Sequence, residues 1–276
     1  MQLAQHPSRS TGMPMSADAA QAGTHADAGV VLIHGFNGTP GDMAGLDARL
    51  AHLGYGTQIV HLPGHSGRLS EMATATWDDW RAAAHGAVRH ALARHDRVVV
   101  VGHSLGGALA LAVAAAEPTV AGVVALCPPC QLRRGLPEAI GMVRRFVPYV
   151  PALRYDMNGT LAERWHLRHS HAYAWVPLRT VHRLCQGLTE LRGELGAVRA
   201  PALIVCARHD HVVPMEDGVE AYLRLGSARK ELLVLSRSYH LVLQDCQREL
   251  VTERVRHFCA RVAPVAQSGP RPEART

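Results

Sequence analysis

Residues 97–117 combine three features that restrict the fold more than any other part of the chain. An apolar run at 97–101 suits a buried strand, Gly-His-Ser-Leu-Gly follows at 102–106, and an alanine-rich stretch at 107–117 predicts a helix. The pattern G-x-S-x-G between a strand and a helix is typical of a nucleophile elbow, which lifts the serine oxygen above the edge of the sheet. We therefore predict that Ser104 is a nucleophile.

The glycines around Ser104 have a steric purpose in this interpretation. A strained turn brings the strand and the helix so close that side chains at Gly102 and Gly106 would collide, and Gly107 extends this tolerance into the first helical turn. The alternative is an ordinary strand-to-helix turn with a serine near the helix start. A base and an acid elsewhere in the chain would decide between the two.

The rest of the chain alternates between strand and helix patterns. Repeated strand and helix units with runs of Val, Ile and Leu imply a parallel sheet that is covered on both faces. We expect strands at 30–33, 57–60, 97–101, 120–126, 202–206 and 231–235, and helices at 42–53, 77–94, 105–116, 215–225 and 245–262.

This alternation is interrupted between the fourth and fifth expected strands. Prolines there divide short amphipathic pieces, such as 165–173 and 180–191, so the segment is too long for a loop and too broken for another strand and helix unit. We expect a cap over the sheet, whose apolar pocket is lined by Leu136, Ile140, Met142, Val143, Phe146 and Val147. The expected organisation is a disordered leader at 1–28, a core at 29–127, the cap at 128–197, the rest of the core at 198–263 and a disordered tail at 264–276.

Composition narrows the class of protein. A chain of 276 residues with 47% hydrophobic and 19% charged residues can bury a sizeable core, and no apolar run approaches the ~20 residues of a spanning helix. The first 28 residues contain no apolar segment of signal-peptide length, and the six cysteines are too scattered for a disulfide framework. We expect a cytoplasmic globular protein without stable membrane insertion.

The charge balance argues against a nucleic-acid partner. The net charge is +6, but aromatic residues make up only 5% of the chain and the basic residues form no long run. We expect a small-molecule partner, and a monomer or a weak homodimer.

A serine nucleophile requires a base, which is commonly a histidine held by a carboxylate. In parallel sheets these groups come from loops at the carboxyl ends of strands. Asp210 follows the expected strand at 202–206, and His240 follows the one at 231–235, so the order Ser, Asp, His is that of a nucleophile elbow on an α/β sheet. Glu216 and Asp217 are the alternative acids, while His103 is expected to have a structural role because its side chain should point away from Ser104.

Two other groups of residues are candidates for a metal or a redox site. His209 and His211 flank Asp210 but lack a matching set of ligands, so we expect no metal. Cys127 and Cys130 form a C-x-x-C pair, but the two prolines between them oppose the helix start of a redox motif, so a buried strand end is the preferred interpretation.

The loop at 34–40, after the first strand, is the candidate for an oxyanion hole. One donor should be the backbone N–H of Leu105, and a second should come from this loop, where Phe36 is placed to offer its N–H. Gly35 and Gly38 allow close approach of the backbone to a substrate, although a plain glycine turn would have the same composition.

With these residues the chain resembles the α/β-hydrolase superfamily, and more closely its bacterial carboxylesterase and monoacylglycerol lipase group. The resemblance covers residues 29–262 and rests on segments 31–40, 62–67, 77–80, 102–107, 207–214 and 239–245. It implies an α/β-hydrolase fold with a small helical cap, a triad of Ser104, Asp210 and His240, oxyanion donors at Phe36 and Leu105, and no cofactor. One departure is Tyr239, where the family usually has glycine, and we expect the tyrosine to narrow the site or reshape its loop.

The expected function is hydrolysis of carboxylic esters with short to medium acyl chains, or of monoacylglycerols, through an acyl-enzyme. The same triad also serves thioesterases, lactonases, C–C bond hydrolases and aminopeptidase-like amidases, because neither fold nor triad determines the bond that is broken. A non-catalytic ligand-binding protein is a further alternative, although it would not need all three triad residues.

Overall fold

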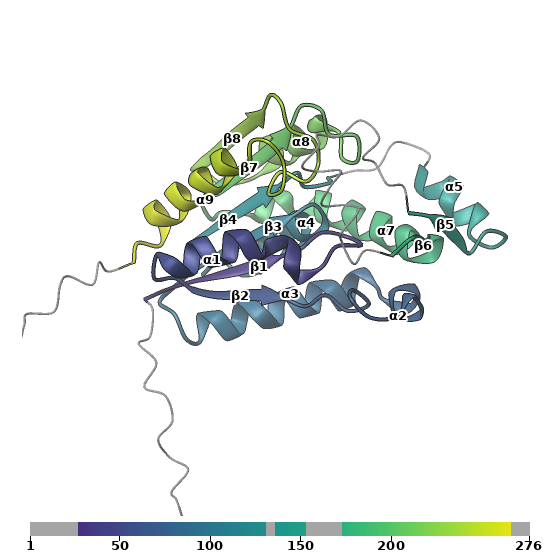
Figure 1. Ribbon diagram of the computed structural model, residues 1–276, viewed down its shortest axis with the longest axis horizontal. Helices are drawn as coiled ribbons and strands as arrows, with labels where there is room; N and C mark the ends of the chain where they lie inside the picture. Colours follow the sequence, from purple (N-terminus) through teal and green to yellow (C-terminus); the bar gives the residue numbers. More distant parts are fainter. Residues whose placement is uncertain (1–26, 131–135, 153–172, 266–276) are drawn as a thin grey trace, which may run out of the picture.

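The fold is built around one sheet in which all neighbouring strands are parallel. The computed structural model describes residues 27–130, 136–152 and 173–265, shown in colour in Figure 1, so most of the expected leader and tail and residues 165–172 lie outside the described residues. The strand order is β2-β1-β3-β4-β7-β8. The bounds are β1 Ala28–Ile33, β2 Gly56–Val60, β3 Arg97–His103, β4 Gly122–Leu126, β7 Ala202–Ala207 and β8 Lys230–Leu235.

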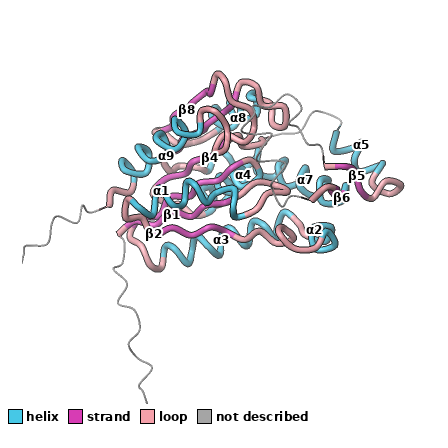
Figure 2. Tube along the Cα trace, viewed as in Figure 1, coloured by secondary structure: helices cyan, strands magenta, loops and turns pink. Residues whose placement is uncertain are grey.

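Helices cover both faces of this sheet, as Figures 1 and 2 show. One apolar cluster contains side chains of α1 (Ala44–His52) and α9 (Arg248–Val262), and the other contains side chains of α3 (Trp77–Leu92), α4 (Leu105–Ala116) and α8 (Met215–Arg224). Successive strand residues contribute to opposite clusters, as with Val99 and Val100 of β3. This arrangement confirms the α/β-hydrolase fold expected from the sequence.

Residues between β4 and β7 form the insertion that the sequence predicts as a cap. Its described elements are α5 (Leu136–Val143), the antiparallel strands β5 (Tyr149–Pro151) and β6 (Trp175–Pro177), α7 (Leu178–Glu194) and the short 3-10 helix η3 (Leu195–Ala197). Figure 1 shows α5, β5 and β6 at the right-hand end of the molecule.

The insertion is fastened to the core through α7. Thr180 Oγ1 donates to the carbonyl oxygen of Met72, 2.7 Å away, in α2 (Leu69–Thr74). Farther along α7, the backbone of Gly187 lies so close to the Trp77 ring that a Cβ there would overlap it.

Most sequence-based elements are present with small shifts at their ends. The helix expected at 42–53 is divided into a 3-10 turn, η1 (Pro40–Met43), and α1, because Asp42 caps the Thr39 N–H at 2.8 Å and starts a separate turn. The last helix begins at Arg248 rather than Asp245, because an Asp245 carboxylate oxygen accepts the Tyr239 N–H at 2.7 Å. β1 starts at Ala28, one residue inside the expected leader, and Val265 of the expected tail packs against the core.

Candidate active site

Ser104 lies at the junction of β3 and α4 in a strained backbone conformation. Its φ is 54° and its ψ is −120°, a region that L-residues with a side chain rarely occupy. The Ser104 N–H donates to the carbonyl oxygen of Leu126 at the end of β4, 2.8 Å away, and the residue is 8% exposed. Such strain persists only where surrounding contacts impose it, which is the expected property of a nucleophile elbow.

The glycines around Ser104 have the steric purpose that the sequence predicts. A Cβ at Gly102 would overlap the carbonyl oxygen of Gly106, and a Cβ at Gly106 would overlap that of Ile33 in β1. At Gly107 the nearest backbone atom would be 3.2 Å away, which is tight but not an overlap. The first two positions therefore require glycine, since backbone atoms cannot move aside as a flexible side chain would.

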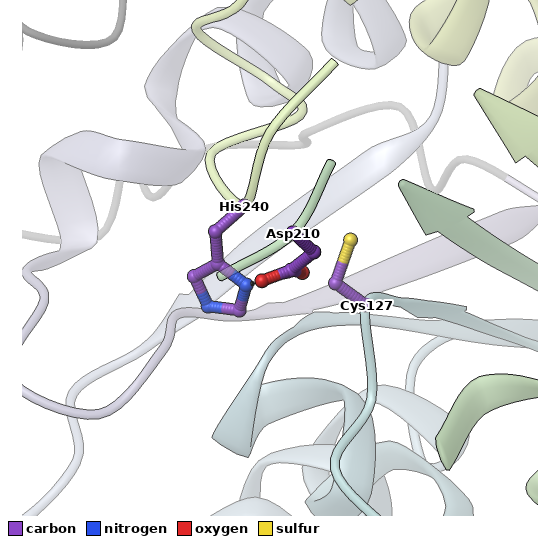
Figure 3. A group of neighbouring side chains, drawn as sticks. All are labelled: Cys127, Asp210 and His240. Atoms are coloured by element: carbon purple, nitrogen blue, oxygen red, sulfur yellow. Dashed lines mark hydrogen bonds and ion pairs between the residues drawn. The ribbon is translucent and has the colours of Figure 1, made fainter. Parts of the chain in front are cut away.

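Asp210 and His240 form a hydrogen-bonded pair from the loops after β7 and β8. His240 Nδ1 and Asp210 Oδ2 are 2.7 Å apart, and the side chains are 10% and 1% exposed. Asp210 Oδ1 accepts the N–H groups of Val212 and Val213, both at 2.8 Å. One carboxylate oxygen is thus held by the backbone, and the other faces His240 (Figure 3).

The surroundings of Asp210 keep it ionised. Burial on its own would raise the pKa of this carboxyl, but the charge and hydrogen bond of His240 and the two backbone N–H groups together lower it below its ordinary value. An ionised Asp210 accepts the Nδ1 proton of His240, which leaves Nε2 of the neutral ring as a proton acceptor.

His103 links the elbow to the His240 loop. Its Nε2 lies 2.9 Å from the carbonyl oxygen of His240, and the two ring centroids are 4.9 Å apart. Burial, with a smaller contribution from His240, lowers the pKa of His103 to about 4, so the ring is neutral near pH 7 and its Nε2–H donates to that carbonyl. The His103 side chain therefore contacts the backbone of the loop that carries His240, and the two rings lie side by side.

The alternative acids lie in other environments. The Asp217 carboxylate is buried and accepts the Cys130 N–H at 3.0 Å, while Glu216 is exposed in the first turn of α8. Of the three candidate acids, Asp210 is the one that the structure pairs with His240.

The loop after β1 passes directly over the elbow. A Cβ at Gly35 would lie 3.2 Å from the Ser104 Cβ, so the glycine allows this approach. The loop turns at 35–38, where the Gly38 N–H donates to the Gly35 carbonyl oxygen at 3.1 Å, and Phe36 occupies this turn. Leu105 is the first residue of α4, and the first N–H groups of a helix have no partner within it. The structure therefore places Leu105 and Gly35, the residue before Phe36, next to Ser104.

Cys127 lies next to Asp210 and His240, although the sequence analysis did not assign it to the site. Its sulfur and the ligand atoms of Asp210 and His240 all lie within 4.8 Å of one another, and Figure 3 shows the carboxylate between the sulfur and the imidazole. Burial, followed by the nearby Asp210 charge, raises the pKa of this thiol well above its ordinary value, and a hydrogen bond to Asp210 adds to the shift. A metal ion here would require the thiolate form and would break the pair of Asp210 with His240, so these donors do not suit one. The thiol instead supports Asp210 from the side opposite His240.

Tyr239 does not have the backbone conformation that would require glycine. Positive φ angles among the described non-glycine residues occur at Asn37, Ser66, Ser104 and Cys127. The Tyr239 ring lies near both histidines beside Asp210, with centroid distances of 5.7 Å to His209 and 5.3 Å to His211. Tyr239 therefore packs the loop after β8 against the loop after β7, which carries Asp210.

The apolar cap residues are more open than the expected pocket requires. Met142 is 70% exposed and Phe146 is 83% exposed, so these two side chains do not form an enclosed wall. A small cavity is lined by Asp210 together with Cys127, Cys206 and Met215.

The chain belongs to the serine aminopeptidase S33 family of α/β-hydrolases, whose sequence model matches residues 24–247. A thermostable monoacylglycerol lipase of Bacillus sp. (strain H-257) is 29% identical over 238 residues, which cover 85% of this chain and 91% of the relative. A carboxylesterase of Bacillus subtilis (strain 168) is 25% identical over 238 residues, covering 84% and 92%.

A solved structure has a similar fold. It comes from work on LipS and LipT, two metagenome-derived lipolytic enzymes, and has a TM-score of 0.78 and 30% identity. The match covers 86% of this chain and 95% of that one. No helix among the described residues combines the length and apolar character needed to cross a membrane.

Proposed function

We propose that this protein is a serine hydrolase that cleaves carboxylic esters through an acyl-enzyme, with Ser104, Asp210 and His240 as its triad. The observation that carries the proposal is the 2.7 Å pair of His240 and Asp210, whose imidazole lies beside the strained elbow. The activities named for the relatives, a monoacylglycerol lipase and a carboxylesterase, support ester substrates.

Acylation begins with proton transfer from Ser104 to His240 Nε2 as the serine oxygen attacks the ester carbonyl. Asp210 holds the imidazole in the required tautomer and stabilises the imidazolium. The backbone N–H groups of Phe36 and Leu105 bind the oxyanion, and His240 then protonates the leaving alcohol.

Deacylation repeats these roles with water as the nucleophile. His240 takes a proton from water, which attacks the acyl carbonyl, and then returns the proton to Ser104 as the acid is released. The chemistry uses only this chain's side chains and backbone N–H groups, and we assign no metal or cofactor to it.

The substrates in this proposal are esters of short to medium acyl chains or monoacylglycerols. Residues 128–197 act as the cap, and apolar side chains of this segment contact the acyl or alcohol part of the substrate at an open surface rather than in an enclosed pocket. All six cysteines are free thiols, which suits a reducing cytoplasm, and the enzyme works there as a monomer or a weak homodimer.

A second candidate is amide cleavage of the aminopeptidase type, which the description of the matched family favours. Both reactions share the acyl-enzyme, so the geometry of the triad does not separate them.

A panel of substrates tests the proposal. Purified protein is assayed on p-nitrophenyl esters of graded acyl length, 1-monoacylglycerols, acyl thioesters and aminoacyl p-nitroanilides, with Ser104→Ala as the blank. We expect Ser104-dependent turnover of esters to exceed that of anilides. Faster turnover of aminoacyl anilides would replace the proposal with the second candidate. A peak at short acyl chains would indicate a general carboxylesterase, and a preference for monoacylglycerols would indicate a lipase.

A further inference from the structure

Asn37, in the turn over the elbow, is tied to Tyr173 by two hydrogen bonds. Asn37 Nδ2 donates to the Tyr173 carbonyl oxygen at 3.1 Å, and the Tyr173 N–H donates to Asn37 Oδ1 at 2.9 Å. The residues are half-buried and 136 positions apart in the sequence. Because the Asn37 amide uses both its donor and its acceptor on the Tyr173 backbone, the two bonds fix the orientation of the Asn37 side chain as well as its distance from Tyr173.

The Tyr173 hydroxyl reaches a third segment, the loop after β2. It donates to the carbonyl oxygen of Gly64 and accepts the N–H of Gly67, both at 3.0 Å. Gly64 has a φ of 78° and Ser66 a φ of 61°, so the hydroxyl closes a loop of unusual backbone shape. Tyr173 therefore joins the loops after β1 and β2 to the insertion just before β6.

The segment that carries Tyr173 is held independently of Asn37. Downstream of β6, Arg183 Nη1 donates to the carbonyl oxygen of Thr74 at 2.7 Å, in addition to the Thr180 bond to Met72. The close contact of Gly187 with Trp77 adds a third attachment. Tyr173 is thus anchored by the core, and the turn at Asn37 gains a support outside its own loop.

That turn sets the orientation of the Phe36 N–H. Asn37 has a φ of 56°, and the turn is closed by the bond from the Gly38 N–H to the Gly35 carbonyl oxygen. The Phe36 ring contacts Trp80 with a centroid distance of 5.9 Å, so its side chain is held by packing on the core. Within this turn, the two hydrogen bonds to the Tyr173 backbone hold the side chain of Asn37, the residue that follows Phe36.

We propose that Asn37 and Tyr173 are positioning residues that hold the Phe36 N–H in the orientation that binds the oxyanion. The inference rests on the proposed function, since it needs an oxyanion at this place. Neither side chain acts on the reacting atoms; both act through the backbone of the turn. Because donors to an oxyanion act mainly in the transition state, a displaced Phe36 N–H lowers kcat more than it changes KM.

Three substitutions separate the parts of this arrangement. Asn37→Gly removes both side-chain bonds and keeps the positive φ without strain. Asn37→Asp keeps the acceptor for the Tyr173 N–H, but it replaces the donor to the Tyr173 carbonyl oxygen with a second acceptor and adds a negative charge. Tyr173→Phe removes the hydroxyl and leaves the backbone bonds to Asn37 in place. Tyr222→Phe in α8, at a half-buried tyrosine outside the site, is the matched control.

The experiment measures kcat and KM on a p-nitrophenyl ester and the inhibition constant of an alkyl trifluoromethyl ketone, whose adduct with serine carries an oxyanion. For Asn37→Gly we expect kcat to fall about 10- to 100-fold. The upper value approaches the effect of removing one oxyanion donor. KM should stay within about 3-fold, because ground-state binding is preserved. The inhibition constant should rise roughly in parallel with the fall in kcat/KM, and Tyr222→Phe should match the wild type.

A folded Asn37→Gly variant with wild-type kcat, or with a loss confined to KM, overturns the inference. If that variant does not fold, Asn37→Asp and Tyr173→Phe test the inference instead. Wild-type values of kcat and of the inhibition constant in both variants would overturn it. If the wild type shows Ser104-dependent ester turnover and the variants are unaffected, the positioning role alone is rejected. Folded wild-type protein without such turnover rejects the proposed function and this inference with it.

Discussion

His103 Nε2 lies 2.9 Å from the carbonyl oxygen of His240, so the residue before the proposed nucleophile supports the proposed base. The bond joins β3 to the loop after β8, which lies at the far end of the strand order from β2. A buried, neutral histidine thereby connects the loop of the proposed base to the strand that precedes the proposed nucleophile.

Replacing His103 tests this support. His103→Phe keeps an aromatic ring but leaves the His240 carbonyl without its donor, which typically costs about 1–3 kcal/mol of unfolding free energy. His103→Gln retains a side-chain N–H donor. We expect kcat on an ester to fall more in the Phe variant than in the Gln variant. Equal kcat in wild type and His103→Phe would show that His240 needs no such support.

Acid should destabilise the fold through two neutral histidines, His103, which is buried, and His65, which is half-buried. Burial lowers the pKa of both His103 and His65 from 6.5 to about 4, so the unfolded chain binds more protons than the folded one between these values. The unfolding free energy should therefore fall as pH decreases from about 6.5 to 4, by about 3 kcal/mol for His103 at 1.36 kcal/mol per pKa unit. Below this range Asp210, whose pKa is lowered from 3.8, adds a further loss as it becomes protonated.

Urea unfolding between pH 7.5 and 4.5 measures this dependence. The curve for His103→Gln should be flatter than that of the wild type, because one of the titrating groups is absent. Parallel curves for the two proteins would show that His103 is protonated to the same extent in the folded and unfolded states.

The amide variant of Asp210 tests its proposed role as the triad acid. Asp210→Asn can still accept the N–H groups of Val212 and Val213, but it removes the carboxylate that orients His240. We expect kcat to fall about 10⁴-fold, as in other triads. Glu216→Gln, at an exposed position in α8, is the control and should retain full activity. A near-wild-type rate for Asp210→Asn would assign the acid to another residue.

Alanine substitutions at the glycines of the elbow should lower the unfolding free energy by different amounts. A Cβ at Gly102 or Gly106 meets backbone oxygen atoms, so we expect a loss of several kcal/mol or failure to fold. Gly107→Ala should be milder, since its nearest contact would be 3.2 Å. Gly86→Ala, at an exposed position in α3 with no atom within 4 Å of the added Cβ, should raise the unfolding free energy by about 1 kcal/mol. Thermal unfolding midpoints in any other order would contradict this ranking.

The sheet and the elbow could be predicted from the sequence because their signals are local. Valine runs mark buried strands, and α4 has the bounds expected from its alanine-rich pattern. His240 could be selected among 18 histidines because the carboxyl ends of parallel strands gather at one edge.

The supporting residues could not be predicted because their partners are distant in the sequence. No local pattern relates Asn37 to Tyr173, or Cys127 to Asp210. The place of Cys127 in the chain offered one clue, since it directly follows β4, and β4 neighbours β3, the strand that precedes Ser104. The small elements α2, β5 and β6 were not predicted because segments of three to six residues carry little periodicity.

Labelling with a fluorophosphonate tests the account most directly, because the reagent requires a serine activated by its base and an oxyanion hole. The account predicts one label per chain, located by peptide mass spectrometry at Ser104. It also predicts no label in Ser104→Ala and a fall in ester turnover of up to ~10⁶ in that variant. Folded wild-type protein that remains unlabelled, or that carries the label at another serine, would contradict it.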